Sequence, residues 1–128
     1  MRKLVSSGSY LEPQIGFSRA VRVGNFVSVA GTAPIGPDGA TVGVGDVYTQ
    51  TMRCLEIAKA ALEEAGASFD HVVRSRIMLT DATTWQDAAR AHGTYFASIR
   101  PATTVVQVSG FVDPDWLVEL EFDAVLDQ

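Results

Sequence analysis

The chain has 128 residues, of which 47% are apolar and 20% charged, as is typical of one soluble globular domain spanning residues 1–128. Its net charge is −5, and its ten Lys and Arg residues form no basic cluster, which argues against binding to nucleic acid. One cysteine cannot form an internal disulfide, and no apolar run approaches the ~20 residues of a membrane span. Because the N-terminal residues also lack the apolar core of a signal peptide, we expect a cytoplasmic protein with no membrane partner.

The first part of the chain is predicted to form short strands joined by turns. Residues 2–5 are compatible with an edge strand, and the Ser- and Gly-rich residues 6–13 are typical of a turn. Residues 17–23 and 26–31 have strand-like composition, and the Gly-Asn pair between them is typical of a two-residue hairpin turn. Residues 32–45 are rich in glycine and contain two prolines, so we expect a loop there.

Two helices and a strand are expected in the middle of the chain. Residues 46–65 carry apolar side chains at helical spacing, with Asp46 as a capping residue and Gly66 where a helix-ending glycine is preferred. Residues 71–80 alternate as a strand, and residues 83–98 show a second amphipathic pattern. In the strand, one predicted face holds Val73, Ser75, Ile77 and Leu79, and the other holds Arg74, Arg76 and Met78.

The C-terminal quarter is predicted to be a β-hairpin, with strands at residues 103–109 and 118–125 around a loop. In the second strand an apolar face alternates with an acidic face. The apolar face consists of Val118, Leu120, Phe122 and Ala124, and the acidic face of Glu119, Glu121 and Asp123.

The element order is therefore β-β-α-β-α-β-β, which predicts an α+β protein with a mixed sheet and two helices on one face. The other face of the sheet is left open and is both polar and apolar. Its predicted members are Arg74, Arg76, Met78, Val105, Gln107, Glu119 and Glu121. The face of the first hairpin strand that carries Thr103, Val105 and Gln107 is accordingly expected to be buried between subunits. Arginines and acids on one face can pair across strands, and such a face needs either water or a second subunit. We expect oligomerisation.

No sequence motif is sufficient by itself to identify a catalytic site. The nucleophile elbow, the phosphate-binding loop and the HExxH zinc motif are all missing from the sequence. Only one cysteine and two histidines are present, His71 and His92, about twenty residues apart. We therefore predict no metal site and no cofactor.

Five segments together form a recognisable pattern in their order and spacing. They are IGFSRAVRVGNFVSVAGTAP (15–34), Gln50-Thr51 at the helix start, VVRSRIMLTD (72–81), RPATT (100–104) and VELE (118–121). With these segments the sequence resembles the RidA (YjgF-like) family of small enamine/imine deaminases. The resemblance implies a chorismate-mutase-like fold and a homotrimer in which the sheets form a central barrel with the helices outside. It also implies a cleft for a small-molecule metabolite at each subunit interface, and the hydrolysis of reactive imines to a keto acid and ammonia.

The resemblance also suggests site residues. Glu119 matches a glutamate that positions the attacking water, and Gly31 matches as well. The main departure is Thr103, which stands where active members have an arginine that grips the substrate carboxylate. Four further positions differ from the frequent family residues: Phe17 for an aromatic hydroxyl, Ala30 for serine, Val105 for cysteine and His92 for asparagine.

Two classes of function follow. In a hydrolase, Glu119 would orient water, His92 would serve as acid, base or donor, and the Gly31 amide and Thr103 hydroxyl would bind substrate. Arg19, Arg76 or Arg100 would then have to replace the missing arginine. The alternative is a non-catalytic trimer that binds a metabolite. An older ribonuclease label of the family fits a chain with net charge −5 least well.

Overall fold

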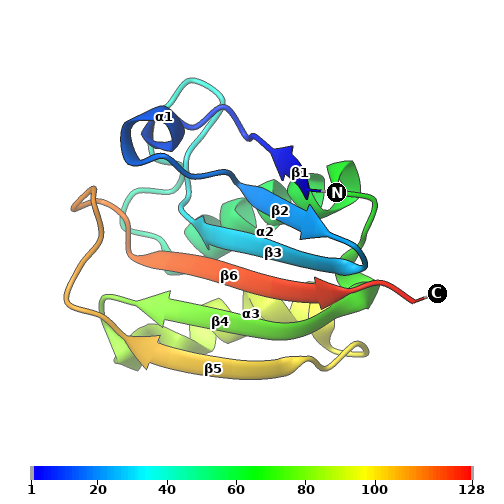
Figure 1. Ribbon diagram of the computed structural model, residues 1–128. Coiled ribbons are helices and arrows are strands. Elements are labelled where there is room, and N and C mark those ends of the chain that lie inside the picture. Colours follow the sequence, from blue (N-terminus) through cyan, green and yellow to red (C-terminus); the bar gives the residue numbers. More distant parts are fainter. Residues whose placement is uncertain (1, 128) are drawn as a thin grey trace.

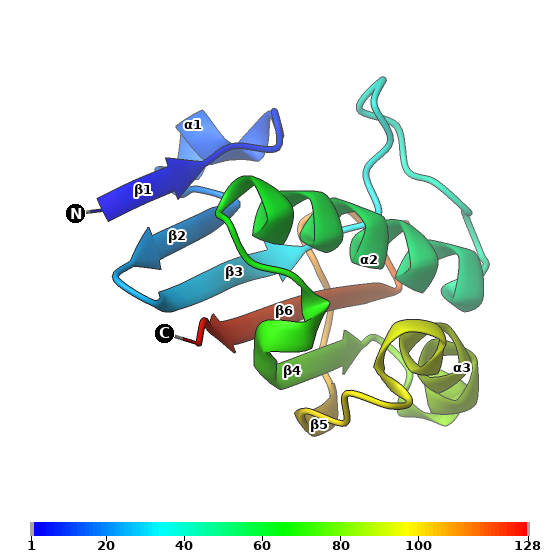
Figure 2. The same cartoon turned by 90° about the vertical axis from the view of Figure 1, so that its right-hand side faces the viewer.

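The computed structural model describes residues 2–127, which form a six-stranded mixed sheet with two long helices on one face (Figures 1 and 2). The helices are α2 (Val47–Glu64) and α3 (Trp85–Phe96). The strands are β1 (Arg2–Val5), β2 (Ala20–Val23), β3 (Phe26–Thr32), β4 (Val72–Leu79), β5 (Ala102–Gln107) and β6 (Val118–Val125). Their order across the sheet is β1-β2-β3-β6-β4-β5, and β4 and β5 are the parallel neighbours. The predicted α+β class and the mixed sheet with helices on one face are confirmed.

A short helix, α1 (Leu11–Ile15), lies where the sequence predicts only a turn. Glu12 in this helix is buried, and its carboxylate accepts hydrogen bonds from the backbone N–H groups of Ser7 and Ser9, at 3.0 and 3.3 Å. These bonds close the preceding loop, a contact that strand and turn preferences do not reveal. The strand expected from residue 17 accordingly begins only at Ala20.

Helix α2 forms as predicted and covers the centre of the sheet. The Asp46 carboxylate accepts a hydrogen bond from the Thr49 N–H at 3.1 Å, and Gly66 has a φ of 89° just beyond the last turn. Its apolar stripe includes Leu55 and Leu62, both fully buried. These side chains belong to one core with the apolar face of β6, which is Val118, Leu120, Phe122 and Ala124.

The prediction of a C-terminal hairpin is wrong, because β4 lies between β5 and β6 in the sheet. Strand β6 pairs antiparallel with β3 on one side and with β4 on the other. Strand β5 follows α3 and pairs parallel with β4, as a crossover connection through a helix allows. The segment between β5 and β6 is anchored on α2, where the Gln50 side chain bonds the Leu117 N–H and the Asp115 carbonyl, at 2.8 and 2.9 Å.

This crossover also reverses the predicted faces of β5. Thr103 lies beside Ser75 and Val105 beside Ile77, and both of these β4 residues are buried under the helices. Thr103, Val105 and Gln107 therefore lie on the helix side of the sheet, and their assignment to the open face is wrong. Thr104 belongs to the open face instead, where its hydroxyl accepts a hydrogen bond from the Arg74 guanidinium.

Strand β4 follows its predicted faces except at its start. Ser75, Ile77 and Leu79 are buried, as predicted. The register with β6 shifts between Val72 and Arg74. Because of this shift Val72 is buried and Val73 is 49% exposed, contrary to the prediction that Val73 faces the core.

Candidate functional site

A β-bulge near the end of β3 brings together the first group of predicted site residues. Between two consecutive matched pairs, β3 has two residues, Ala30 and Gly31, where β6 has one. Gly31 lies directly beside Glu119: a Cβ added to Gly31 would lie 2.9 Å from the carboxylate Oε1. Any other residue at position 31 would therefore displace this carboxylate. Ala30 lines a hollow on the open face with Arg74 and Arg76.

Glu119 is half-buried on the open face, opposite Met78 of β4. Burial raises the pKa of its carboxyl group, and the negative charge of Glu121 adds to this rise, whereas the positive charge of Arg19 opposes it. A carboxylate with a raised pKa binds a proton more readily near neutral pH, as a general base must. The environment of Glu119 is thus compatible with the activation of water.

Arg19 stabilises the bulge through hydrogen bonds. Its side chain is only 4% exposed, and its Nη1 donates to the Gly31 carbonyl at 2.7 Å and to Thr32 Oγ1 at 3.0 Å. Its Cζ lies 5.2 Å from the ring centroid of Phe17, which joins this residue to the group. Gly31 therefore lies between the Arg19 guanidinium and the Glu119 carboxylate. From the sequence, Arg19 is predicted only as a replacement cation, and nothing in strand alternation reveals that it is buried.

The second group of site residues lies around Thr103 of β5. His92 Nε2 lies 2.9 Å from Ser75 Oγ, which lies 2.7 Å from Thr103 Oγ1. Thr103 Oγ1 donates its only proton to the Pro101 carbonyl at 3.0 Å. The Ser75 hydroxyl must then donate to Thr103, and His92 Nε2–H to Ser75, which leaves Nδ1 of neutral His92 as an acceptor. Burial lowers the pKa of His92 and so favours this neutral form.

Ser75 was not predicted as a site residue, although the sequence carries a signal: Ser75 is a polar residue on the otherwise apolar inner face of β4. A fully buried hydroxyl needs hydrogen-bond partners, and here these partners are two predicted site residues.

His92 and Thr103 line a cleft of about 320 Å³, together with Arg100. Arg100 has a φ of 59° and is the one non-glycine residue with positive φ among residues 2–127. It lies four residues after Phe96, the last residue of α3, and its N–H donates to the Phe96 carbonyl at 2.9 Å; a positive φ at the end of a helix is usually adopted by glycine. Within the same described residues it forms no salt bridge.

The two groups do not meet within one subunit. Glu119 lies on the open face of the sheet, whereas His92 contacts Ser75 on the helix side. Val105 follows Thr103 on the edge strand and is 44% exposed. The structure therefore brings Phe17, Gly31 and Glu119 together with Arg19, and His92 and Thr103 together with Ser75, but it separates these two groups.

The described residues offer no arrangement for a metal ion: none of their His, Cys, Asp and Glu side chains gather in a group of three or more. No helix between residues 2 and 127 is both long and apolar enough to cross a membrane.

Residues 8–126 match the sequence profile of the family described as Endoribonuclease L-PSP. The chain belongs to this family. The crystal structure of another member, Rv2704 of the YjgF/YER057c/UK114 family from Mycobacterium tuberculosis, is 41% identical and superposes with a TM-score of 0.89, covering 98% of this chain and 100% of that one. These matches confirm the resemblance to the RidA (YjgF-like) family and its fold.

Two other L-PSP family proteins are informative about chemistry. The 3-aminoacrylate deaminase RutC of Acinetobacter baylyi is 35% identical over 108 residues, which are 84% of this chain and 85% of that protein. The structure of E. coli TdcF with bound serine is 25% identical, with a TM-score of 0.78, and covers 87% of this chain and 88% of that one.

Proposed function

We propose that this L-PSP family protein hydrolyses small reactive imines or enamines to a keto acid and ammonia, in a cleft between two subunits of a homotrimer. The observation that carries the proposal is the half-buried Glu119 carboxylate, which faces Gly31 at a bulge in the sheet. The deaminase RutC and the serine complex of TdcF support a small nitrogen-containing metabolite as the ligand.

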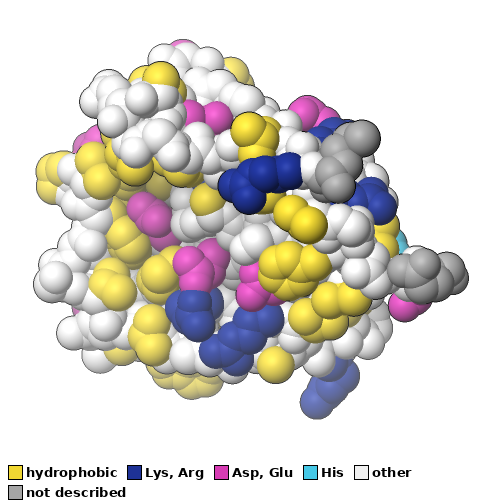
Figure 3. All heavy atoms as spheres, viewed as in Figure 1, with side chains coloured by type: hydrophobic (Ala, Val, Ile, Leu, Met, Phe, Trp, Pro, Cys, Tyr) yellow, Lys and Arg dark blue, Asp and Glu magenta, His cyan; other side chains and the backbone are white. Residues whose placement is uncertain are grey.

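The sheet has the surfaces that such a trimer needs. Figure 3 shows basic and acidic side chains next to each other in the middle of the open face, where Arg76 and Glu121 form an ion pair, with apolar side chains around them. At the edge of the sheet, Val105 and Val106 of β5 are 44% and 37% exposed. An edge strand with exposed apolar side chains favours association. A neighbour that covers this edge would supply its own Glu119 group to the cleft of His92 and Thr103.

Hydrolysis of an imine requires one residue that acts first as a general base and then as a general acid. Glu119 takes a proton from water while the water oxygen attacks the imine carbon, and the π electrons of the C=N bond move to nitrogen. The resulting tetrahedral carbinolamine receives the proton from Glu119 on its nitrogen. Glu119, again ionised, then takes the hydroxyl proton and delivers it to the same nitrogen, so that ammonia leaves as the C–N bond breaks and the C=O bond of the keto acid forms.

Arg100 is our candidate for the cation that holds the substrate carboxylate in place of the arginine missing at Thr103. Arg76 is engaged in its ion pair with Glu121, and Arg19 is held by Gly31 and Thr32. Arg100 lines the same cleft as Thr103 and has no acidic partner among the described residues. A guanidinium can grip a carboxylate with two parallel hydrogen bonds.

Replacement of Glu119 with glutamine tests the proposed activity. A panel of 2-imino acids generated in situ by an amino-acid oxidase, together with 3-aminoacrylate, should contain at least one compound that the wild type hydrolyses. Glu119→Gln should lower that rate by roughly 10²–10⁴-fold, because the amide cannot take the proton. Glu63→Gln, the same change at an exposed position of α2, serves as the control and should retain activity. Binding without acceleration for any compound would favour a non-catalytic metabolite-binding trimer instead.

The proposed assembly predicts a mass of three chains, each of 13.7 kDa, by light scattering in dilute neutral buffer. Val106→Asp should reduce this mass, because Val106 lies on the open face at the exposed edge strand. Val44→Asp is the matched control, since Val44 is 64% exposed in the loop before α2. A monomer mass for the wild type would rule out an inter-subunit cleft.

Despite the family name, we expect no tight RNA binding at physiological salt. Phosphate contacts need clustered Lys and Arg. Here the two arginines of β4 lie opposite acids, since Arg74 is paired in register with Asp123 and Arg76 with Glu121. Fluorescence anisotropy with a labelled single-stranded RNA should show no sub-micromolar binding. Tight binding that weakens steeply with salt would revive the ribonuclease alternative.

A further inference from the structure

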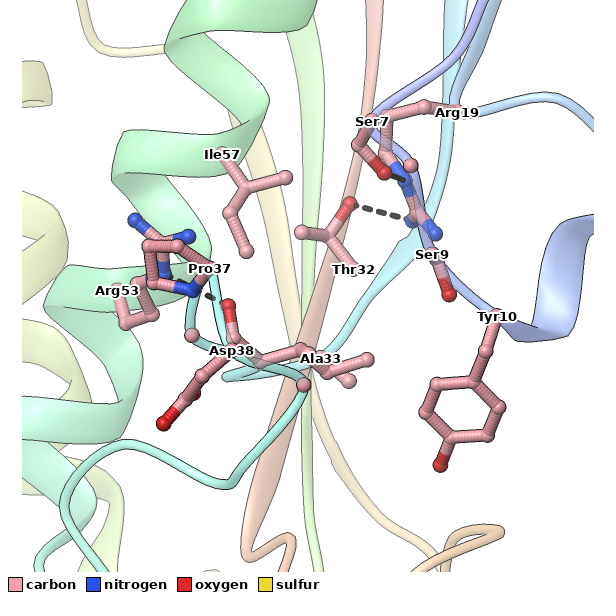
Figure 4. Close-up of a pocket in the computed structure, with 14 residues that line it drawn as sticks. Ser7, Ser9, Tyr10, Arg19, Thr32, Ala33, Pro37, Asp38, Arg53 and Ile57 are labelled. Atoms are coloured by element: carbon pink, nitrogen blue, oxygen red, sulfur yellow. Dashed lines mark hydrogen bonds between the residues drawn. The ribbon is translucent and has the colours of Figure 1, made fainter.

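A second cleft, of about 310 Å³, lies within one subunit, between α2 and the segment that leads into α1 (Figure 4). Arg53 and Ile57 of α2 line one side, and Ser9 and Tyr10 line the other. This volume is near the lower end of the roughly 300–1,000 Å³ of small-molecule sites. The cleft is separate from the cleft of His92 and Thr103, with which it shares no lining residue.

Arg19 lines this cleft with part of its guanidinium open. Nε donates to Ser7 Oγ at 3.2 Å, and Nη1 donates to Gly31 and Thr32, but Nη2 has no hydrogen-bond partner among residues 2–127. No fully buried side-chain nitrogen or oxygen atom of those residues lacks a partner, so Nη2 must reach solvent. Arg19, which is 4% exposed and lines the cleft, thus keeps one donor that no described residue uses.

The wall formed by α2 also carries a cation, Arg53, which is held by a hydrogen bond. Arg53 Nε donates to the Ile35 carbonyl at 2.8 Å, which ties α2 to the loop of residues 33–45. Arg53 Nη1 makes only a 3.3 Å contact with the carboxylate of the exposed Glu56. The loop is ordered by its own hydrogen bonds, among them Gly36 N–H to the Ala40 carbonyl at 2.8 Å. Hydrogen bonds therefore fix both α2 and the loop at this wall of the cleft.

The charges around the cleft favour an anionic group near Arg19 and Arg53. Asp38 is the one acidic residue that lines the cleft, and its Oδ1 already accepts the Ala40 N–H at 3.0 Å. The Glu12 carboxylate partly neutralises the positive charge of Arg19. The two residues are linked by Ser7 Oγ, which donates to Glu12 Oε2 at 2.9 Å. Glu12 does not line the cleft. The remaining walls combine apolar side chains, among them Ile35 and Ile57, with the hydroxyl groups of Ser7, Ser9, Tyr10 and Thr32.

We infer that this cleft binds a small carboxylate, with the carboxylate group on Arg19 and Arg53 and an apolar body against Ile35 and Ile57. Guanidinium groups bind carboxylates through charge-assisted hydrogen bonds, and a site of this kind combines apolar walls with few polar groups. The inference does not depend on the proposed imine hydrolysis, because the two sites use different residues for ligand contact.

Benzoate is a suitable probe, and benzamide is its neutral counterpart of the same shape. Titrated into the ¹⁵N-labelled full-length protein, benzoate should shift the amide signals of residues 7–10, 33–39 and 53–57, and benzamide should bind at least about tenfold more weakly. Arg53→Gln should weaken benzoate binding about tenfold. Ile57→Trp should abolish it by filling the cleft. Arg90→Gln, an exposed arginine on α3, is the matched control and should bind as the wild type does.

These variants avoid the buried Arg19, so that loss of binding is not confused with loss of fold, and a thermal melt of each one checks this. The inference is wrong if no benzoate binding is detected at 20 mM, a level that corresponds to roughly 2 kcal/mol of binding free energy. It is also wrong if benzamide binds equally well, if Arg53→Gln and Ile57→Trp leave the affinity unchanged, or if the shifts fall only on residues around Gly31, Thr103 and Glu119. The last result would leave the proposed catalytic cleft standing.

Discussion

Replacement of Arg100 with glutamine should lower the turnover of 2-imino acids by about a hundredfold or more. A hydrogen bond to a charged group contributes roughly 1.5–3 kcal/mol, and a bidentate grip on a carboxylate has two of them. If the contact acts only in binding, KM should rise; if it orients the imine for attack, kcat should fall as well. Steady-state kinetics on the best 2-imino acid from the panel distinguishes these cases.

Two further substitutions make this result specific. In the double variant Arg100→Gln with Thr103→Arg, a guanidinium returns to the same cleft, and part of the activity should return with it. Arg100→Gly should be equally inactive yet more stable by about 1 kcal/mol, because glycine adopts the positive φ of 59° without a Cβ clash. An Arg100→Gln variant with full activity would show that Arg100 does not hold the carboxylate.

Leu120→Asp should unfold the protein. Leu120 is completely buried under the helices, in the central strand β6. An unpaired carboxylate there loses its hydration without gaining a partner, which costs several kcal/mol in addition to the lost apolar burial. Because the total stability of a domain is roughly 5–15 kcal/mol, most or all of it should be removed. Circular dichroism during urea unfolding measures the effect.

Leu120→Met is the control for this substitution. It keeps the apolar character and nearly the volume of the side chain, and we expect it to cost less than about 1.5 kcal/mol. If Leu120→Asp instead unfolded cooperatively within about 1 kcal/mol of the wild type, β6 would not be the centre of the core. The architecture of the sheet would then need revision.

Local sequence signals predicted the elements whose environment is set by neighbours along the chain. The alternation of β6 reports its two faces directly, because one face is packed under helices and the other carries acids. Asp46 and Gly66 likewise mark the ends of α2 through bonds and dihedral angles close in sequence. For the same reason, Glu119 could be placed on the open face from its spacing to Leu120 alone.

Contacts between distant residues were not predictable in this way. Strand β5 has no signal that selects β4 over β6 as its neighbour, so the face of Thr103 was assigned wrongly. The buried Arg19 depends on Ser7 and on Gly31 and Thr32 of β3, which come from two other segments of the chain. The separation of His92 from Glu119 depends on the whole sheet, and only the family resemblance suggested that a second subunit completes the site.

We propose that Glu119 of one subunit and the Thr103 cleft of its neighbour form one site. A crystal structure of the wild-type protein soaked with pyruvate, the keto acid expected from 2-aminoacrylate, tests it most directly. We predict a trimer in which pyruvate lies between Gly31 and Glu119 of one subunit and Arg100 and Thr103 of the next, with its carboxylate on Arg100. An assembly that leaves these two groups apart, or pyruvate bound away from both, would contradict the claim.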